Sequence, residues 1–575
     1  MEEVRRLALI YALQNAVRYG GRAMVKPVVS KLLGSRPELR SMAREVVKLV
    51  EEVVAEVNSM GLEKQRELLE RLRPGALEEE RRDEGRRGLP PLPRAEKGRV
   101  VTRFAPNPDF VLHLGSARPA IISYEYARMY GGRFILRFED TDPKTKPPMP
   151  EAYEMIREDL RWLGLKWDEE HIQSLRMEVY YEHARRLIEL GGAYVCTCSP
   201  ERVRELRAAG VRCACAERSV EDQLELWDKM LGGEFGEGEA VLRVKTDIRH
   251  PNPSVRDWIA FRIIDTDRYP HPLTGSKYVV WPTYNFACGV DDHLMGVTHI
   301  FRGKEHEINT LKQKYLYEHF GWEYPVAVHF GRLSVEGVVL SKSRMREGIE
   351  KGFYRGFDDP RLATLRALRR RGILPEAIWD LILNVGIKPS SARISLENLY
   401  ALNRRYVEPR ANRYMFVPDP APLEVRGARG ELVAEIPRHP SHPERGVRRL
   451  KLKLTDGVAR VYVPGGDLRG MRPGAELRLL GLANLRLVAE GVAEVVSADP
   501  GYAKARGLPI IQWCPAGSAV PATVLLARGS ELEEVKGLAE PGVRELKEGD
   551  HAQFYRFGFV VLEDAREMRF VYSHD

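Results

Sequence analysis

Several features are scarce or missing in this sequence. Only 6 of the 575 residues are cysteine, too few for a disulfide-rich secreted scaffold. No run approaches the roughly 18 apolar residues of a membrane helix, and the first residues, MEEVRRLALIYALQNAVRYGG, have no apolar stretch before a small-residue cleavage site. We therefore expect a soluble, cytoplasmic protein.

The sequence also has little excess of one charge. Lys and Arg total 90 against 82 Asp and Glu, which gives a net charge of +8. This excess excludes a histone-like chain and an acidic disordered tail, and it permits a nucleic-acid partner without requiring one. With 43% hydrophobic residues the chain can form real cores, and its length predicts about three to five domains. We find no internal repeat.

The N-terminal part is predicted to be helical. Val46, Val50, Val53 and Val57 recur on one helical face. A charged run without periodicity, EEERRDEGRRG, then precedes a Pro-rich stretch, which is typical of a linker. We therefore expect a helical domain over 1–76 and a linker over 77–98.

The next part alternates strand and helix. A strand is expected over 99–104, a helix over 116–130 and a second strand over 133–138. This βαβ order predicts a parallel sheet. Ligands of such sheets bind beyond the carboxyl ends of the strands, so residues 105–116 and 139–142 are the expected site.

The remaining chain changes character several times. A Cys cluster and the Gly- and Glu-rich run GGEFGEGEA break the pattern and predict an insertion, and helical runs such as EAIWDLILNVG follow later. Short alternating stretches such as KLKLTDGVARVYV then turn at Asp456-Gly457, a hairpin signal. We expect a sheet domain split into 99–190 and 276–345, an insertion at 191–275, a helical connector at 346–402 and β-barrels at 403–575.

Two loops have residues suited to phosphate. The loop RFAPNPDFVLHLGS runs from Arg103 to Ser116, where a helix N-terminus, the small Gly115 and a donating His113 suit a nucleotide. The loop VLSKSR has Lys342, a point charge for polyphosphate. Taken singly, a buried structural histidine and a solvated loop lysine are the commoner cases.

Four of the cysteines form two close pairs. Cys196 and Cys198 are separated by fourteen residues from Cys213 and Cys215. Four thiolates suit a tetrahedral structural zinc ion, although reduced thiols or disulfides remain alternatives. Cys514 is expected in a core.

The start of the predicted β-region is rich in arginine and tyrosine, which suits RNA because cations follow phosphates and aromatic rings can stack on bases. A solvated charged face is the alternative. The candidate RNA-binding residues are Arg404, Arg405, Arg410 and Arg413.

Taken together, the two phosphate loops resemble the HIGH and KMSKS signatures of class I aminoacyl-tRNA synthetases, in order and separation. The runs RFEDTDP, YNFACGVDDHLMGVTHIFRGKEH and GRLSVEG are similar to glutamyl-tRNA synthetases of the archaeal and eukaryotic type, close kin of the glutaminyl enzymes. The resemblance covers residues 99–350 and, more loosely, the rest. It implies a multidomain α/β and all-β fold: a Rossmann-type sheet with an acceptor-stem-binding insertion that contains a zinc knuckle, an N-terminal helical domain, a helical connector and anticodon-binding β-barrels.

The resemblance implies a two-step reaction: ATP with Mg²⁺ activates glutamate, and the product is transferred to the terminal adenosine of tRNA(Glu). Whether tRNA(Gln) is also charged stays open. The implied catalytic residues are His113, Gly115, Ser116 and Lys342, and the implied ATP-binding residues are Pro106, Asn107, Pro108, His113, Gly115, Arg332, Leu333, Leu340, Ser341, Lys342 and Ser343.

The resemblance also implies which residues select glutamate. Arg302 stands where glutaminyl enzymes have a small neutral residue, and an Arg–carboxylate pair is geometrically selective. The implied glutamate-binding residues are Arg103, Glu139, Tyr284, Cys288 and Arg302. The neighbouring Asp291-Asp292-His293 is expected to be mostly structural.

Two departures from the family signatures stand out. Ser116 replaces the second histidine of HIGH, so His113 and the backbone are expected to contact phosphate. Val339 replaces the first lysine of KMSKS, which leaves Lys342 as the charged residue.

The sequence leaves three alternative functions. They are a glutaminyl-tRNA synthetase, a HIGH-type nucleotidyltransferase acting on a small metabolite, and a non-catalytic RNA-binding or scaffold protein. Arg302 disfavours the first, the insertion and long β-region the second, and the retention of both signatures the third. We expect a monomer whose N-terminal helices can dock a protein partner.

Overall fold

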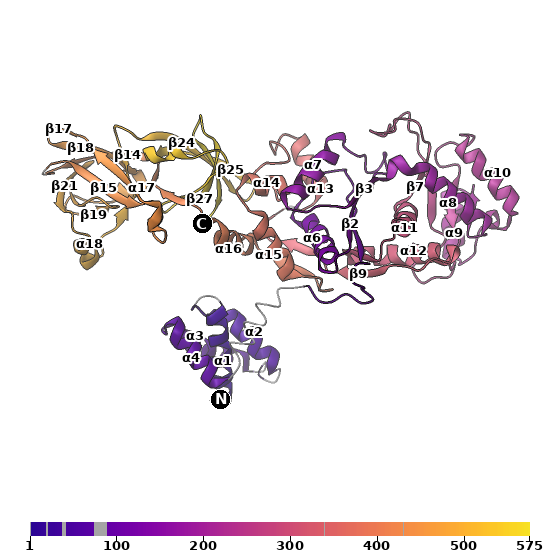
Figure 1. Cartoon of the computed structure of the whole chain (residues 1–575), viewed down its shortest axis with the longest axis horizontal. Coiled ribbons are helices and arrows are strands. Elements are labelled where there is room, and N and C mark those ends of the chain that lie inside the picture. The colour runs from indigo at the N-terminus through magenta and orange to yellow at the C-terminus, as the bar shows by residue number, and fades with distance from the viewer. Residues whose placement is uncertain are drawn as a thin grey trace. The chain divides into compact units, whose positions relative to one another are not determined.

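A computed structural model (Figure 1) describes residues 2–18, 21–36, 39, 42–73, 89–338, 340–428 and 430–575. The chain divides into two compact units, Met1–Pro91 and Leu92–Asp575, and each is described by itself. The predicted linker lies, as far as residue 88, outside the described residues. Among the described residues, no helix is both long and apolar enough to cross a membrane.

The N-terminal unit is helical, as predicted. One face of its third helix buries Val46, Val50, Val53 and Val57, the valines whose spacing predicted that helix. The fully buried Gln65 donates through its amide to the carbonyls of Val57 and Gly21. The helices are α1 (Glu2–Arg18), α2 (Val25–Ser35), α3 (Ala43–Asn58) and α4 (Leu62–Leu72).

The second unit begins with the predicted parallel sheet. Strand β1 pairs with β2, and β2 with β3, all in parallel register. The amide of Thr298 donates to the carbonyl of Val101 at 2.9 Å, which joins the later parallel pair β8–β9 to β1. The elements of this first part are β1 (Val101–Phe104), α6 (Leu114–Met129), β2 (Arg133–Phe138), α7 (Pro150–Trp162), β3 (Glu169–Ile172) and α8 (Met177–Glu189).

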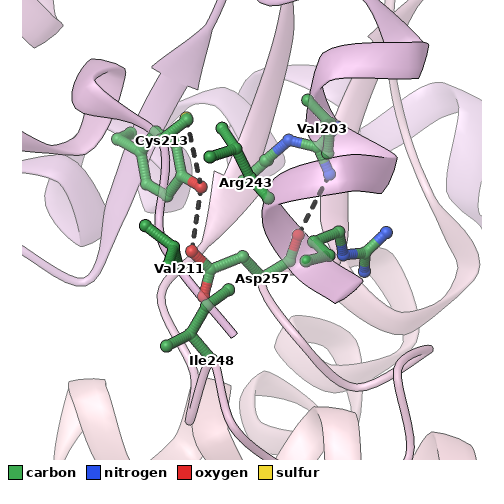
Figure 2. A pocket seen from close by; sticks show the side chains of 9 residues that line it. Val203, Val211, Cys213, Arg243, Ile248 and Asp257 are labelled. Carbon is green, nitrogen blue, oxygen red and sulfur yellow. Dashed lines mark hydrogen bonds between the residues drawn. The ribbon is translucent and has the colours of Figure 1, made fainter. Parts of the chain in front are cut away.

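The chain then enters the expected insertion, whose strands form an antiparallel sheet in the order β4-β5-β6-β7. Beside it lies a small pocket, where the buried Asp257 accepts a hydrogen bond from the hydroxyl of Tyr194 at 2.8 Å (Figure 2). The antiparallel sheet extends past residue 275, the expected end of the insertion. Its elements are β4 (Ala193–Cys196), α9 (Pro200–Ala208), α10 (Val220–Leu231), β5 (Val241–Val244), β6 (Ile259–Ile263) and β7 (Val280–Pro282).

The second half of the parallel sheet and the connector follow. Helix α11 starts directly after Thr283, and its later residues Cys288 and Asp292 contact Arg137 near the carboxyl end of β2. The elements are α11 (Tyr284–Leu294), β8 (His299–Gly303), α12 (Glu307–Phe320), β9 (Val326–Phe330), β10 (Leu333–Val335), α13 (Lys342–Glu350), α14 (Leu365–Arg370), α15 (Pro375–Val385), β11 (Ala392–Ile394) and α16 (Leu396–Val407).

The C-terminal region is built of sheets, as predicted. The seven-stranded sheet runs β12-β26-β27-β28-β24-β25-β13. Its two edge strands are separated only by Met415, so the sheet curls into a nearly closed barrel. An eight-stranded sheet follows, in which seven strands run β17-β18-β14-β21-β20-β19-β22 and the eighth, β23, pairs with β18 off this path.

The longer C-terminal elements, seen at the orange and yellow end of Figure 1, are β12 (Asn412–Tyr414), β13 (Phe416–Pro418), β14 (Pro420–Arg426), β15 (Leu432–Pro437), β16 (Val447–Leu452), β18 (Val458–Pro464), α17 (Gly465–Leu468), β19 (Glu476–Leu479), β20 (Asn484–Ala489), β21 (Val492–Ser497), α18 (Pro500–Arg506), β24 (Val520–Arg528), β25 (Glu531–Ala539), β26 (His551–Phe554), β27 (Gly558–Asp564) and β28 (Arg569–His574). The shortest strands are β17 (Leu454–Thr455), β22 (Ile510–Ile511) and β23 (Cys514–Pro515).

The short helix α14 joins the barrel to the loop before α6. At its start, the amide of Leu365 donates to the carbonyl of Leu112 at 2.9 Å. Just past its end, Arg371 donates to the carbonyl of Ser573 at 2.9 Å, and the ring of His551 donates to the carbonyl of Gly372 at 2.9 Å. The first signature loop is therefore held against one end of α14, and the barrel against the other.

We predict that Gly372→Ala loosens this junction. Gly372 has a φ of +73°, and an added Cβ would overlap the side chains of Val561 and His551. Overpacking of this kind costs about 1–3 kcal/mol, in addition to the cost of the left-handed backbone. Thermal unfolding should show a lower melting temperature than that of the control Gly352→Ala, where φ is +71° but nothing lies within 4 Å. Equal melting temperatures would contradict the steric account.

Candidate active site

His113 caps helix α6. Its ring Nδ1 accepts from the amide of Ser116 at 3.3 Å, and the Ser116 hydroxyl accepts from the amide of His113 at 3.5 Å. This reciprocal pair is a capping box, which explains why serine can stand where the family signature has its second histidine. Because Nδ1 is an acceptor, the ring proton lies on Nε2, the nitrogen left to donate to a ligand.

Burial, reinforced by the positive charge of Lys342, lowers the pKa of His113 to about 4. The ring is therefore neutral near pH 7. Gly115 permits this packing, because a Cβ there would lie 2.9 Å from Cε1 of the His113 ring. The first signature thus presents a neutral N–H donor and the free amides of a helix N-terminus.

The second signature reaches the first through a salt bridge. Lys342 is the first residue of α13, and its Nζ lies 2.8 Å from Oδ1 of Asp109. Leu340 approaches the same place, since its Cδ1 lies 4.0 Å from a Cβ built on Gly115. Ser341 and Ser343 are exposed beside Lys342, whereas Val339 lies outside the described residues. The structure therefore brings His113, Gly115 and Lys342 together, with Asp109 as the lysine's internal partner.

The remaining expected ATP-binding residues lie earlier in the first loop and after β9. The carbonyl of Pro106 accepts from the amide of Glu139 at 3.0 Å, and that of Pro108 from the amide of Met149 at 2.9 Å. Asn107 is partly buried, and its Oδ1 has no hydrogen-bond partner among the described residues.

Arg332 and Leu333 follow β9, and the carbonyl of Arg332 accepts from the amide of Ala392 at 2.9 Å. The buried Arg118 of α6 donates to the carbonyl of Gly331 at 2.6 Å. Arg118 therefore links the first signature helix to the chain just before Arg332, a link that the sequence did not reveal.

A buried charge network lies at the carboxyl ends of β1 and β2. Asp292 accepts from Nε of Arg103 at 3.0 Å and from Nη1 of Arg137 at 2.8 Å, and Arg137 also donates to Glu139 at 2.9 Å. The Sγ of Cys288 lies 3.3 Å from Nη2 of Arg137. Arg137 thus lies at the centre of a group formed by Arg103, Glu139, Cys288 and Asp292. The sequence did not predict Arg137 as part of the site.

The charge state of this network follows from its pairing. Burial opposes ionisation of Asp292, but Arg103 and Arg137 outweigh it and hold its pKa at about 2. Burial raises the pKa of Glu139 despite Arg137, and it raises that of Cys288 to about 12, so Cys288 is a thiol. Arg103 is therefore already neutralised by Asp292.

Arg302 lies in a different environment. It is 5% exposed, and its Nη2 is bound by the hydroxyls of Thr310 and Tyr324 and the amide oxygen of Gln313. Among the described residues, its Nη1 has one hydrogen-bond partner, the Tyr284 hydroxyl at 3.4 Å, and its Nε has none. Within the described chain, none of the partners of Arg302 is a carboxylate. A buried cation without a counter-charge is costly, so this guanidinium is suited to an anionic ligand.

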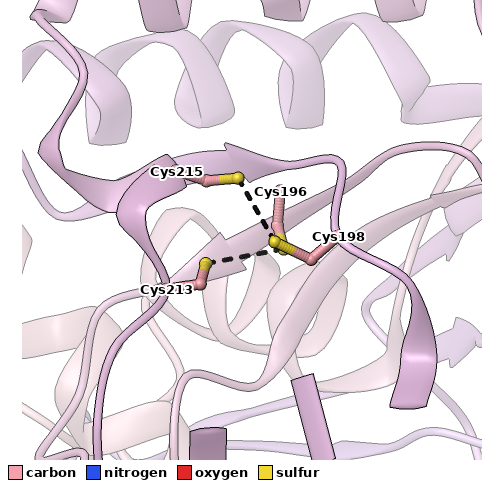
Figure 3. A group of neighbouring side chains, drawn as sticks. All are labelled: Cys196, Cys198, Cys213 and Cys215. Atoms are coloured by element: carbon pink, nitrogen blue, oxygen red, sulfur yellow. Dashed lines mark hydrogen bonds between the residues drawn. The ribbon is translucent and has the colours of Figure 1, made fainter. Parts of the chain in front are cut away.

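The four clustered cysteines converge (Figure 3). Their ligand atoms all lie within 4.8 Å of one another. Cys196 Sγ is 3.8 Å from Cys213 Sγ, and Cys198 Sγ is 3.6 Å from Cys215 Sγ. A tetrahedral zinc ion with Zn–S distances of 2.3 Å needs sulfurs about 3.8 Å apart. The arrangement fits zinc, and none of the four forms a disulfide.

The candidate RNA-binding arginines lie at the end of α16 and the start of the barrel. Arg404, Arg405 and Arg410 are exposed and Arg413 is partly buried. Arg410 and Arg413 lie 3.4 Å from the carboxylates of Glu376 and Glu408, respectively.

Separate parts of this chain match separate domains of known proteins. The family model described as tRNA synthetases class I (E and Q), catalytic domain, matches residues 99–409. Two anti-codon binding domain models of the same class match residues 411–498 and 510–563. Proteins named glutamate–tRNA ligase from Thermofilum pendens and Pyrococcus abyssi are 58% and 54% identical over 578 residues, which is 100% of this chain and of each relative. One from Pyrobaculum islandicum is 55% identical over 581 residues, 99% of each chain.

We predict that His113 stays neutral down to about pH 4. Because its pKa falls from 6.5 to about 4 on folding, the unfolded chain binds the extra proton first, and stability from this residue is lost as pH falls between those values. NMR titration of ring-labelled histidine, with His113→Asn to assign the signal, should give the low pKa. A His113 signal that titrates near 6.5 would contradict the buried neutral ring.

Proposed function

Because the chain belongs to the class I tRNA synthetases for glutamate and glutamine, we propose that it is a glutamate–tRNA ligase. The observation that carries this reading is Arg302, a buried guanidinium whose described partners are all neutral. The side-chain carboxylate of glutamate would supply the missing charge. The amide of glutamine would leave the guanidinium without a counter-charge, at a cost of about 1–3 kcal/mol.

The other glutamate-binding roles follow from charge. Glu139 would accept the α-amino group of the substrate, and Tyr284 lies beside Arg302. Arg103 and Cys288 contact the carboxylate of Asp292. We therefore assign Arg302 the direct carboxylate contact and Arg103 a supporting one, rather than equal roles.

In the first step the α-carboxylate of glutamate attacks the α-phosphorus of ATP, which gives glutamyl-adenylate and releases pyrophosphate. Magnesium accompanies ATP as part of the substrate and neutralises phosphate charge. His113 donates from Nε2 as a neutral ring, and the amides at the start of α6 add further donors. Lys342 exchanges Asp109 for phosphate oxygens, so it acts as a charged clamp. Arg332, Leu333 and the 106–108 loop hold the nucleoside side.

In the second step the terminal ribose hydroxyl of tRNA(Glu) attacks the activated carbonyl, which forms the ester and releases AMP. We assign acceptor-stem binding to the insertion at 191–275 and anticodon binding to 403–575, with Arg404, Arg405, Arg410 and Arg413 on phosphate. We propose a cytoplasmic monomer whose N-terminal helices can dock a protein.

We also propose that Cys196, Cys198, Cys213 and Cys215 hold one structural zinc ion. The sulfur separations support it, and a four-thiolate set has no open position for chemistry. The ion would fix the loop after β4 to the turn before α10, and so shape the insertion.

The ligase function predicts selective charging that depends on Arg302. The purified chain should attach glutamate to tRNA(Glu), and parallel assays with tRNA(Gln) define its tRNA range. Arg302→Ala should lower kcat/KM for glutamate by about 100-fold and reduce discrimination against glutamine. Arg128→Ala, an exposed change on α6, is the control. Unchanged amino-acid selectivity in Arg302→Ala would overturn the assignment of Arg302.

The zinc proposal predicts one metal ion per chain. Elemental analysis should find zinc in the purified protein and lose it in Cys213→Ser, with a lower melting temperature. Cys514→Ser changes a buried cysteine outside the cluster and should keep the metal. Equal zinc content in the two variants would refute the site.

A further inference from the structure

Three neutral oxygens hold one nitrogen of Arg302. Its Nη2 lies 2.6 Å from Thr310 Oγ1, 3.0 Å from Gln313 Oε1 and 2.9 Å from the Tyr324 hydroxyl. Gln313 is fully buried, and its Oε1 also accepts from Tyr324 at 2.7 Å. These three contacts thus anchor the guanidinium through one of its nitrogens, Nη2.

The directions of these bonds are determined by chemistry. A guanidinium can only donate, so each of the three oxygens must accept from Arg302, and the two hydrogens of Nη2 are shared among them. Tyr324 then gives its own proton to Gln313 Oε1, and Thr310 can give its proton to His329 Nε2 at 2.9 Å. The anchor is therefore internally consistent without any charged acceptor.

The acids of the site are engaged elsewhere. Asp292 is bound by Arg103 and Arg137, and Glu139 by Arg137. The hydrogen bonds to Nη2 therefore fix the position of Arg302, while its positive charge has no counter-charge among the described residues. Its Nε and Nη1 can still donate.

We propose, resting on the glutamate-binding role of Arg302 above, that Gln313 is a specificity-determining positioning residue, assisted by Thr310 and Tyr324. These side chains orient Arg302 by hydrogen bonds that bring no negative charge. Because these side chains are neutral as well as suitably shaped, the charge of the guanidinium stays available for the carboxylate of glutamate.

This role separates charge from geometry. A glutamate at position 313 has nearly the shape of glutamine and can accept the same two hydrogen bonds, so a purely structural role makes Gln313→Glu a mild change. If neutrality matters, the new carboxylate pairs with Arg302 and competes with the substrate carboxylate. The two roles therefore predict opposite outcomes for one nearly isosteric substitution.

The test compares Gln313→Glu with the unmodified chain and with Gln313→Met, which keeps the volume but loses the oxygen. Pyrophosphate exchange with tRNA present gives kcat and KM for glutamate, glutamine and ATP. We expect Gln313→Glu to raise the glutamate KM by about 10- to 100-fold, to leave the ATP KM unchanged, and to lower glutamate-over-glutamine selectivity more than Gln313→Met does.

A second matched pair of variants, at Thr310, keeps the proposal testable if the variants at Gln313 do not fold. Thr310→Asp and Thr310→Asn have the same shape and differ in charge, so only the aspartate variant should lose selectivity. Calorimetric binding of glutamate and glutamine provides a readout that does not depend on turnover.

The outcomes distinguish two failures. If the unmodified chain shows no preference for glutamate, the proposed function and the role of Gln313 both fall. If it prefers glutamate and Gln313→Glu keeps that preference, only the role of Gln313 is overturned. A selectivity loss that is equal in Gln313→Glu and Gln313→Met also overturns it, because loss of the anchor alone would then explain the result.

Discussion

The site depends on one shared carboxylate. Asp292, on α11, accepts from Arg103 on β1 and Arg137 on β2, so it ties a helix that follows the insertion to two strands that precede it. It also pairs with both arginines in a buried region, where an unpaired charge is costly. Arg302, on the neighbouring strand β8, has no carboxylate partner among the described residues, so its charge is available to a ligand. The preference of the site for a negative charge therefore depends on which arginines already have a charged partner.

The phosphate side of the site depends on a different kind of contact. The first turn of α6 is closed by a reciprocal pair between His113 and Ser116, which fixes both the tautomer and the position of the ring. Lys342 supplies a positive charge from another helix, and Asp109 forms a salt bridge with it. In the function proposed above, the phosphates would therefore meet one neutral donor and one charged donor.

Helix α14 connects the C-terminal barrel to the first signature loop. It contacts the loop before α6 through a backbone hydrogen bond at one end, and the barrel through side-chain hydrogen bonds to carbonyls near its other end. The barrel and the loop before His113 therefore contact the same short helix. In the insertion, four cysteine sulfurs from two loops lie within 4.8 Å of one another.

Much of the fold could be predicted from the sequence, because periodicity is local: the valines of α3, the βαβ order and the alternating C-terminal strands all specify elements within a few turns of chain. The residue types of the site could also be predicted, since His113, Lys342 and Arg302 lie in recognisable runs. What the sequence could not decide was pairing. Three pairings depend on contacts between separate elements: Asp292 pairs with Arg103 and Arg137, Asp109 pairs with Lys342, and the hydrogen-bond partners of Arg302 in the described chain are the neutral Thr310, Gln313, Tyr324 and Tyr284. Only the tertiary structure decides them, because charge compensation is set by distance in space rather than by order along the chain.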